Sequence, residues 1–320
     1  MECLFVMDPI EQIDPYKDTT LVMMLAAAKR GHNVHYCRIE DLWLDGSVAN
    51  ATVWPTTVRR SMGDHYTLEP PINRPLDDFS IVFMRKDPPV DIDYIHATYL
   101  LDRAPASTLV VNSPKALRGC NEKLFALEFP ELVPPTVVTS NIPRLLDFCD
   151  RQGGRMVLKP VDGRGGEGIF IVSRDDPNHR TILETLTSFG RRRALAQRYL
   201  PEIMESGDKR VIVVNGEPLG AVMRQPGTGD FRSNVHSGGK VAPCALDDHD
   251  RKIAATLGDQ LRARGIVFAG LDVIGGYLTE INITSPTLIQ EIAEFTGWHL
   301  EEEIIDAAVD ACLTAGSGVR

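Results

Sequence analysis

One short segment of the chain holds three side chains that bind hard metal ions. Residues 270–286 read GLDVIGGYLTEINITSP, in which two apolar runs flank a Gly-Gly pair. This pattern predicts a β-hairpin, because a Gly-Gly pair between two apolar runs is a turn signal. Asp272 lies on the first predicted strand, and Glu280 and Asn282 lie on the second. Two carboxylates and one amide therefore belong to a single hairpin.

The loop of this hairpin decides whether the three side chains can meet. Glu280 and Asn282 share a face, because side chains alternate along a strand. Asp272 joins them only if it pairs directly with Glu280, which requires a loop of odd length. The simplest is a three-residue loop over 275–277 with a glycine in the left-handed conformation of a bulge. A two-residue Gly-Gly loop is expected to place Asp272 on the opposite face.

The chemistry of these three donors indicates a particular metal. Carboxylate and amide oxygens without His or Cys are ligands of Mg²⁺, with Mn²⁺ as a substitute, and such an ion normally accompanies the phosphates of a nucleotide. A solvated hairpin with ordinary surface acids would explain any one of the three residues. Together they lie in a strongly apolar run, where a charge needs a partner. The set predicts a metal site.

A glycine-rich loop predicts contact with phosphate. Lys159 lies on a predicted strand, and the loop 161–168 that follows contains four glycines: Gly163, Gly165, Gly166 and Gly168. Backbone N–H groups of such a loop can surround phosphate oxygens. The loop is not a Walker A motif, because no Gly-Lys-Ser/Thr follows and the next element is a strand. The glycines alone are a weak signal, which the preceding lysine strengthens.

Several arginines are candidates for binding anions: Arg85, Arg210, Arg224 and Arg232. Arg85 follows the predicted strand 81–84, and ligands of open α/β sheets bind beyond the carboxyl ends of strands. A charged surface loop fits the same pattern. Arg232 lies in the long glycine-rich segment 225–243, which we interpret as an active-site lid. Since no Ser/His/Asp or Cys/His set is recognisable, we expect direct phosphoryl transfer to an acid, with catalysis by positioning and charge neutralisation.

Composition excludes several classes of protein. The chain has 320 residues, a net charge of −10 and a hydrophobic content of 43%. An acidic chain without a basic stripe argues against nucleic-acid binding. No apolar run approaches the roughly 20 residues that span a bilayer, and the amino terminus lacks the basic region of a signal peptide. Six scattered cysteines indicate reduced thiols, so we expect a cytoplasmic protein.

The order of predicted elements indicates an α/β protein of two or three domains. A strand, a helix and a strand over 3–37 open the chain, without the glycine fingerprint of a dinucleotide-binding fold. Residues 45–78 are expected to form an excursion with short strands. A last helix over 300–313 is expected to precede a mobile tail, 314–320.

Several runs of the sequence closely resemble prokaryotic glutathione synthetase, an ATP-grasp ligase. They are VMDPI at 6–10, MRKDPP at 84–89, NEKLF at 121–125, LKP at 158–160, GDKRV at 207–211, GLD at 270–272 and LTEINITSPT at 278–287. The resemblance spans nearly the whole chain and implies the ATP-grasp fold. It implies an N-terminal α/β (pre-ATP-grasp) domain at 1–120, a central lid domain at 121–200 and a C-terminal α+β domain at 201–320 with the flexible loop 225–243.

The resemblance also implies an activity and a role for each matched residue. The expected reaction joins γ-glutamylcysteine to glycine through an acyl phosphate, with ATP and Mg²⁺, in a homotetramer. The residues that would bind ATP are Lys123, Lys159, Gly163, Gly165, Gly166, Gln197, Tyr199, Leu200 and Asp208. Asp272, Glu280 and Asn282 would bind the metal, Arg210, Arg224 and Arg232 would act in catalysis, and Arg85, Asn282 and Ser285 would bind the substrate.

Three features depart from the family pattern, and two other functions remain open. Arg164 and Glu167 put charges into the phosphate loop, and the residues at the lid tip, 234–237, are larger than the family pattern leads us to expect. The segment 45–78 matches no motif of the family. One alternative is a related ATP-grasp ligase that adds amino acids to another acid, such as a peptide terminus. The other is a non-catalytic nucleotide-binding regulator, which would be expected to have lost a metal ligand.

Overall fold

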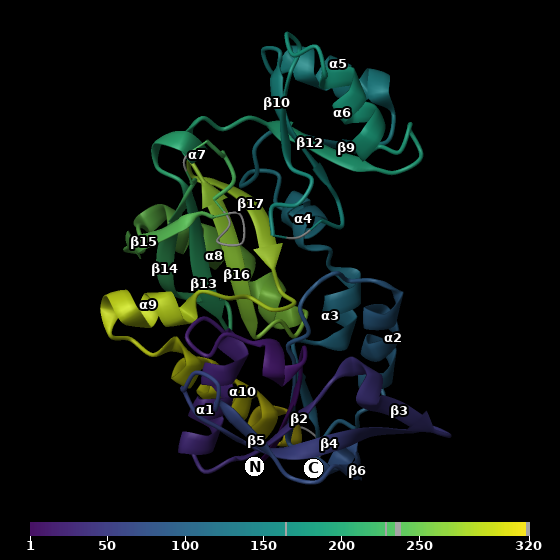
Figure 1. The fold of residues 1–320 in the computed structure, drawn as a ribbon, viewed down its shortest axis with the longest axis vertical. Coiled ribbons are helices and arrows are strands. Elements are labelled where there is room, and N and C mark those ends of the chain that lie inside the picture. Colours follow the sequence, from purple (N-terminus) through teal and green to yellow (C-terminus); the bar gives the residue numbers. More distant parts are fainter. Residues whose placement is uncertain (164, 228, 234–237, 318–320) are drawn as a thin grey trace.

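A computed structural model of the protein describes residues 1–163, 165–227, 229–233 and 238–317. Three β-sheets follow one another along the chain (Figure 1). None of the helices in these described ranges is long and apolar enough to cross a membrane.

The first sheet belongs to the amino-terminal part of the chain. Its strands are β1 (Glu2–Val6), β2 (Asn33–Cys37), β3 (Leu42–Asp45), β4 (Val48–Val58), β5 (Tyr66–Leu68), β6 (Ile72–Pro75), β7 (Ile81–Met84) and β8 (Leu109–Val111). They run in the order β3-β4-β2-β1-β7-β8, while β5 and β6 also pair with β4. The pairs of β1 with β2 and β7, and of β7 with β8, are parallel. The excursion 45–78 holds the 11-residue strand β4 besides the short strands that we expected.

Helices α1 (Thr19–Lys29), α2 (Ile92–Leu101) and α3 (Pro114–Gly119) accompany this sheet. The carboxylate of Asp18 accepts a hydrogen bond from the backbone N–H of Leu21 at 2.6 Å, as expected for the N-cap of α1. Helix α10 (Leu300–Ser317) returns from the far end of the sequence to pack on α1, β7 and β8. It extends through Ser317, so the tail expected from Thr314 is helical over its first residues.

The second sheet has a core of its own. Its strands β9 (Thr136–Thr139), β10 (Arg155–Pro160), β11 (Phe170–Ser173) and β12 (Ala194–Arg198) are antiparallel in the order β11-β10-β12-β9. Helices α5 (Ile142–Arg151) and α6 (His179–Leu186) cover one face, with Leu145, Phe148 and Leu183 packed on Met156 and Leu158. This layer projects from the rest of the molecule (Figure 1).

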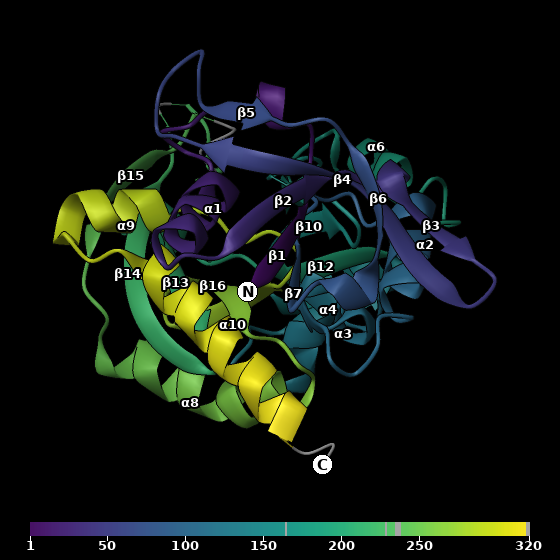
Figure 2. The same ribbon diagram turned by 90° about the horizontal axis from the view of Figure 1, so that it is seen from below.

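The third sheet is antiparallel and carries the hairpin of the predicted metal site. Its strands are β13 (Asp208–Val214), β14 (Glu217–Gln225), β15 (Lys240–Cys244), β16 (Phe268–Ile274) and β17 (Tyr277–Asn282), in the order β15-β14-β13-β16-β17. Helix α8 (Asp248–Ala263) packs on one face through Ile253 and Leu257. Helices α9 (Ile289–Thr296) and α10 pack on the other, so the sheet lies between two helical layers (Figure 2).

The first and third sheets share their hydrophobic core, while the second sheet does not join it. This arrangement fits an ATP-grasp architecture, in which a rigid base carries a separately packed lid. The domain boundaries at residues 120 and 200 stay a prediction.

Asn112 fastens the third sheet to the first. Its buried side chain donates to the carbonyls of Phe268 and Ile283, both at 2.7 Å. Its amide oxygen accepts from the backbone N–H groups of Val267 and Phe268 at 2.8 and 3.0 Å. Four backbone groups at the ends of β16 and β17 therefore depend on one side chain.

We predict that Asn112→Ala lowers the free energy of unfolding by about 2–4 kcal/mol, because it leaves buried backbone groups without partners. The matched control is Asn50→Ala, since the Asn50 side chain bonds only locally to the carbonyl of Val48; its effect should stay within about 0.5 kcal/mol. Urea unfolding of both variants measures the difference. Equal losses would contradict the role given to Asn112.

Candidate functional site

The hairpin of β16 and β17 brings the predicted metal ligands together by an unexpected route. Asp272 pairs directly with Glu280, as predicted. The loop, however, is the two-residue turn of Gly275 and Gly276, both with positive φ, and the three-residue loop that we expected is wrong. A bulge at Thr279 inserts one extra residue into β17 and restores the pairing, and its hydroxyl donates to the carbonyl of Asp272 at 3.1 Å.

Two lysines converge on Glu280. The Lys159 ammonium lies 3.2 Å from Glu280 Oε1, and the Lys123 ammonium lies 3.7 Å from the same oxygen. Lys123 also donates to the carbonyl of Gly163 at 2.5 Å. Burial alone would raise the pKa of Glu280, but the charges of the two lysines outweigh it, and the pKa lies below its ordinary value. Glu280 is therefore ionised at neutral pH.

Two arginines converge in the same way on Asp272. Arg210 Nε lies 2.6 Å from Asp272 Oδ1, and Arg224 Nη2 lies 3.0 Å from Oδ2. Burial acts to raise the pKa of Asp272, yet these two guanidinium groups hold it well below its usual range. Arg224 also pairs with Asp208, which accepts a further hydrogen bond from Ser233 Oγ at 3.1 Å. Burial raises the pKa of Asp208, and the charge of Asp272 acts in the same direction.

These charged groups open onto one cavity of about 660 Å³ between the second and third sheets. All but one of the predicted site residues line it: Lys123, Lys159, Gly163, Gly165, Gly166, Gln197, Tyr199, Leu200, Asp208, Arg210, Arg224, Arg232, Asp272, Glu280, Asn282 and Ser285. Lys123 and Ser285, which are 162 positions apart in the sequence, thus meet around a space large enough for a nucleotide.

Arg85 is the exception, since it lies behind the cavity. It is buried, donates from Nε to Thr20 Oγ1 at 3.2 Å and from Nη2 to the carbonyl of Pro286 at 2.9 Å, and lies over the ring of Phe268. Its neighbours Asp87 and Pro88 line the cavity instead. Arg85 therefore holds the segment that follows Ser285, and direct contact with a substrate stays a prediction.

Part of the lining of this cavity is apolar, with Val157, Ile169, Leu200, Ile203 and Ile274. Apolar walls suit the faces of a flat ring. The side chain of Gln197 is turned away to Thr136 Oγ1 at 3.0 Å.

Glu122 was not singled out as a site residue. It begins the short helix α4 (Glu122–Phe125), lines the cavity, and accepts three hydrogen bonds at Oε1. The donors are the N–H groups of Ile283 and Thr284, at 2.9 and 3.1 Å, and the Thr284 hydroxyl at 2.8 Å. The only signal in the sequence was its position directly before Lys123. Glu122 ties the lysine to the segment that follows Asn282.

The predicted lid segment 225–243 is longer than the connection in the structure, because Gln225 ends β14 and residues 240–243 belong to β15. Residues 226–239 connect the two strands, and the predicted tip 234–237 is outside the described residues. Arg232 pairs with Asp230 at 2.7 Å and reaches the carbonyl of Gly166 at 3.4 Å. The segment thus contacts the glycine-rich loop across the cavity. Of the two charged departures from the family pattern, Glu167 lines the cavity and Arg164 lies outside the described residues.

The donors that the hairpin presents fit a hard divalent ion. Asp272 and Glu280 are ionised and adjacent, and Asn282 donates from Nδ2 to the carbonyl of Gly270 at 3.2 Å. The amide oxygen is therefore the atom of Asn282 that can bind a cation. In the part of the chain that the structure describes, no group of three or more His, Cys, Asp and Glu side chains is arranged for a metal. Two carboxylates with one amide oxygen suit Mg²⁺ or Mn²⁺.

Comparison with known proteins places the chain in a family. Residues 1–118 match the N-terminal domain of prokaryotic glutathione synthetase, and residues 122–297 match its ATP-grasp domain. Glutathione synthetase of Gloeobacter violaceus is 45% identical over 97% of both chains. That of Escherichia coli O127:H6 is 46% identical over 91% of this chain and 92% of its own.

Solved structures of low identity share the fold. D-cycloserine synthetase DcsG aligns with a TM-score of 0.69 at 16% identity, over 98% of this chain and 100% of that chain. D-alanine–D-alanine ligase from Bacillus anthracis, complexed with ATP, aligns with a TM-score of 0.57 at 15% identity, over 98% of this chain and 97% of its own. The chain therefore belongs to the prokaryotic glutathione synthetase family, and it is an ATP-dependent carboxylate-amine ligase with the ATP-grasp fold.

Proposed function

We propose that the protein joins γ-glutamylcysteine to glycine to give glutathione, ADP and phosphate. The cysteinyl carboxylate attacks the γ-phosphorus of ATP, ADP leaves, and the glycine amine then displaces phosphate from the acyl phosphate. The observation that carries this proposal is that all but one of the predicted residues line the same cavity, beside the direct pair of Asp272 and Glu280. The identity of 45% to curated glutathione synthetases supports the choice of substrates.

The nucleotide end of the cavity follows from its charges and shape. Lys123 and Lys159, with the glycine-rich loop, are the groups for the ATP phosphates, because ammonium and backbone N–H groups bind phosphate oxygens. The apolar slot beside Gln197, Tyr199 and Leu200 takes the adenine ring. Asp208 lies near this end, held by Arg224.

Asp272, Glu280 and Asn282 hold Mg²⁺, with Mn²⁺ as a substitute. When bound, the ion neutralises charge on the ATP phosphates and orients the γ-phosphate. The protein's own contribution is to keep both carboxylates ionised in a buried place, which the lysines and arginines around them achieve.

Arginines supply the remaining positive charge. Arg210 and Arg224 lie beside Asp272 and are placed to steady the acyl phosphate, and Arg232 closes over the glycine-rich loop. Ser285 and Asn282 lie at the acid-substrate end, and Arg85 acts there through Pro286. Enclosure by the segment 225–243 would protect the acyl phosphate from water.

The family likeness also supports proposals on organisation. We place the N-terminal unit at 1–120, the central lid unit at 121–200 and the C-terminal unit at 201–320. We further propose that the enzyme is a cytoplasmic homotetramer with no nucleic-acid or membrane partner.

Phosphate release tests the function. We predict rapid release with ATP, Mg²⁺, γ-glutamylcysteine and glycine together, and at most about 1% of that rate when γ-glutamylcysteine or glycine is left out. Without γ-glutamylcysteine no acyl phosphate can form, and without glycine no amine displaces phosphate from it. A panel of other acids and amines is assayed in parallel. Turnover only with another acid would identify a different ATP-grasp ligase, and no turnover with any pair would identify a regulator.

The pH dependence of stability tests the charge balance around Glu280. Because the pKa of Glu280 is lower in the folded protein, its ionised form stabilises the fold above the unfolded pKa of about 4.3, and this contribution is lost as pH falls below it. Glu280→Gln should therefore cost about 1–3 kcal/mol at pH 7, by removing the partner of two buried lysines. The deficit should keep nearly its full size down to about pH 4.3 and shrink as the pH falls further, toward the folded pKa of Glu280.

Urea unfolding of the wild type and Glu280→Gln between about pH 2.5 and pH 8 measures this deficit on both sides of the unfolded pKa. The control is Glu128→Gln, which removes an exposed carboxylate paired with Arg264; we expect it to change stability by at most about 1 kcal/mol throughout. A deficit for Glu280→Gln that stayed constant over the whole range would contradict the ion pairs with Lys123 and Lys159.

A further inference from the structure

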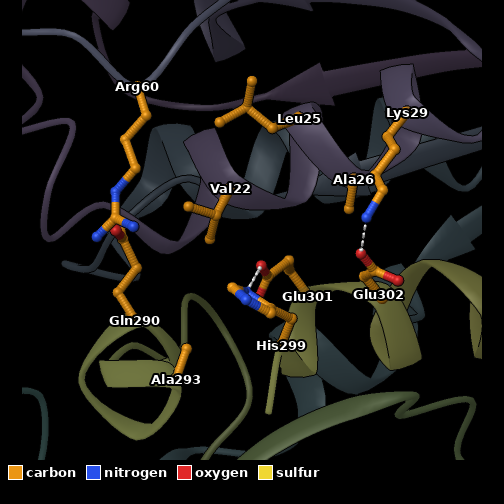
Figure 3. A pocket seen from close by; sticks show the side chains of 10 residues that line it. All are labelled: Val22, Leu25, Ala26, Lys29, Arg60, Gln290, Ala293, His299, Glu301 and Glu302. Atoms are coloured by element: carbon orange, nitrogen blue, oxygen red, sulfur yellow. Dashed lines mark hydrogen bonds and ion pairs between the residues drawn. The ribbon is translucent and has the colours of Figure 1, made fainter. Parts of the chain in front are cut away.

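A second cavity of about 220 Å³ lies between α1, α9 and α10, and it shares no lining residue with the ligase cavity (Figure 3). Val22, Leu25 and Ala26 of α1 form an apolar wall, with Ala293 of α9 facing them. A cavity of about 150 Å³ accommodates benzene. This one therefore suits a molecule of the size of one aliphatic amino acid, and it is too small for a nucleotide.

Two side chains that line this cavity, Gln290 and Glu301, each carry a buried oxygen acceptor without a donor among the described residues. Gln290 is 3% exposed, and its Nε2 donates to the carbonyl of Asp18 at 2.6 Å, but its Oε1 receives no hydrogen bond from any described residue. Glu301 Oε2 is buried without a donor in the same way, while its Oε1 contacts His299 Nδ1 at 2.9 Å. Buried acceptors left unpaired cost about 1–3 kcal/mol each. A ligand in the cavity that brings donors, such as an ammonium group, can satisfy both once the two side chains turn toward it.

The charges around the cavity are balanced. Lys29 pairs with Glu302 at 2.7 Å, whereas Arg60 contacts Glu294 only at 3.6 Å. Arg60 points into the cavity toward Gln290 (Figure 3). The guanidinium also lies over the ring of Tyr16, with its central carbon 5.3 Å from the ring centroid. Neither contact is a hydrogen bond, so its N–H groups can bind a carboxylate through two parallel hydrogen bonds. Positive and negative groups in equal number favour a zwitterion.

We propose that this cavity is a binding site for a free aliphatic α-amino acid. The ammonium group is bound by Gln290 Oε1 and Glu301 Oε2, and the carboxylate by Arg60. The aliphatic side chain packs against Val22 and Leu25.

The site is connected to the ligase cavity through two short links. Leu288, which lines the ligase cavity, precedes Gln290 by two residues and has a left-handed φ of 84° at the N-cap of α9. Gln290 also holds Asp18, and Thr20 two residues further accepts from Arg85. A ligand bound at Gln290 is therefore expected to change the KM for the acid substrate more than the kcat.

Calorimetric titration of the full-length enzyme with L-leucine tests the proposal, with a non-hydrolysable ATP analogue and Mg²⁺ present throughout. We expect saturable binding of one leucine per chain. The matched probes 4-methylpentanoate, which lacks the ammonium group, and 3-methylbutylamine, which lacks the carboxylate, should each bind at least about tenfold more weakly. Valine, isoleucine and methionine are titrated in parallel, and no saturable binding by any of the four amino acids would overturn the proposal.

Two pairs of variants locate the binding. Ala293→Phe fills the cavity and should abolish leucine binding, while Ala28→Phe makes the same change at an exposed position of α1 and should leave it intact. Glu301→Gln should weaken binding about tenfold, and Glu303→Gln, on the exposed side of the same turn, should not. Ala293→Phe should keep its ligase activity without leucine.

If Ala293→Phe does not fold, the Glu301→Gln and Glu303→Gln pair decides the question. Undiminished leucine binding in Ala293→Phe or Glu301→Gln would contradict the site. So would a change of oligomeric state in Ala293→Phe without any amino-acid binding, since the cavity would then be an interface between copies of the chain.

Discussion

The structure depends on keeping two carboxylates ionised where an apolar sheet would favour their neutral forms. Asp272 and Glu280 face each other across β16 and β17, and burial opposes the charge of both. Four cations reverse that preference, two arginines at Asp272 and two lysines at Glu280. The protein thus keeps in its interior the negative charge that a divalent ion needs. The four cations that keep these carboxylates ionised are also the ones expected to bind phosphate groups.

Every element around the cavity can be understood as a support for this arrangement. The second sheet brings Lys159 and the glycine-rich loop, α4 brings Lys123, and β13 and β14 bring the arginines. Asn112 and Glu122 then bond to the backbone at both ends of the hairpin, from parts of the chain that are more than 150 residues away in sequence. Because both supports come from outside the third sheet, the position of the hairpin depends on packing between sheets.

Local chemistry explains which features were predictable from sequence. The N-cap at Asp18 follows from a local signal, and the shared face of Glu280 and Asn282 follows from alternation along a strand. The pairing of Asp272 with Glu280 was expected from a three-residue loop, whereas it arises from a two-residue turn and a bulge. The bulge at Thr279 was missed because it depends on a contact across the strands, the hydroxyl of Thr279 with the carbonyl of Asp272. Arg85 donates to the carbonyl of Pro286, 201 residues away, and Glu122 accepts from the N–H group of Ile283, 161 residues away. Patterns within one segment of the sequence cannot predict such contacts.

Anomalous diffraction from a crystal grown with Mn²⁺ and a non-hydrolysable ATP analogue tests the central claim most directly. The account predicts a manganese peak at metal-ligand distance, about 2.1 Å, from oxygens of Asp272, Glu280 and Asn282, with Lys123 and Lys159 moved onto the phosphates. A manganese peak bound elsewhere, or these three side chains without an ion while the nucleotide fills the cavity, would contradict it.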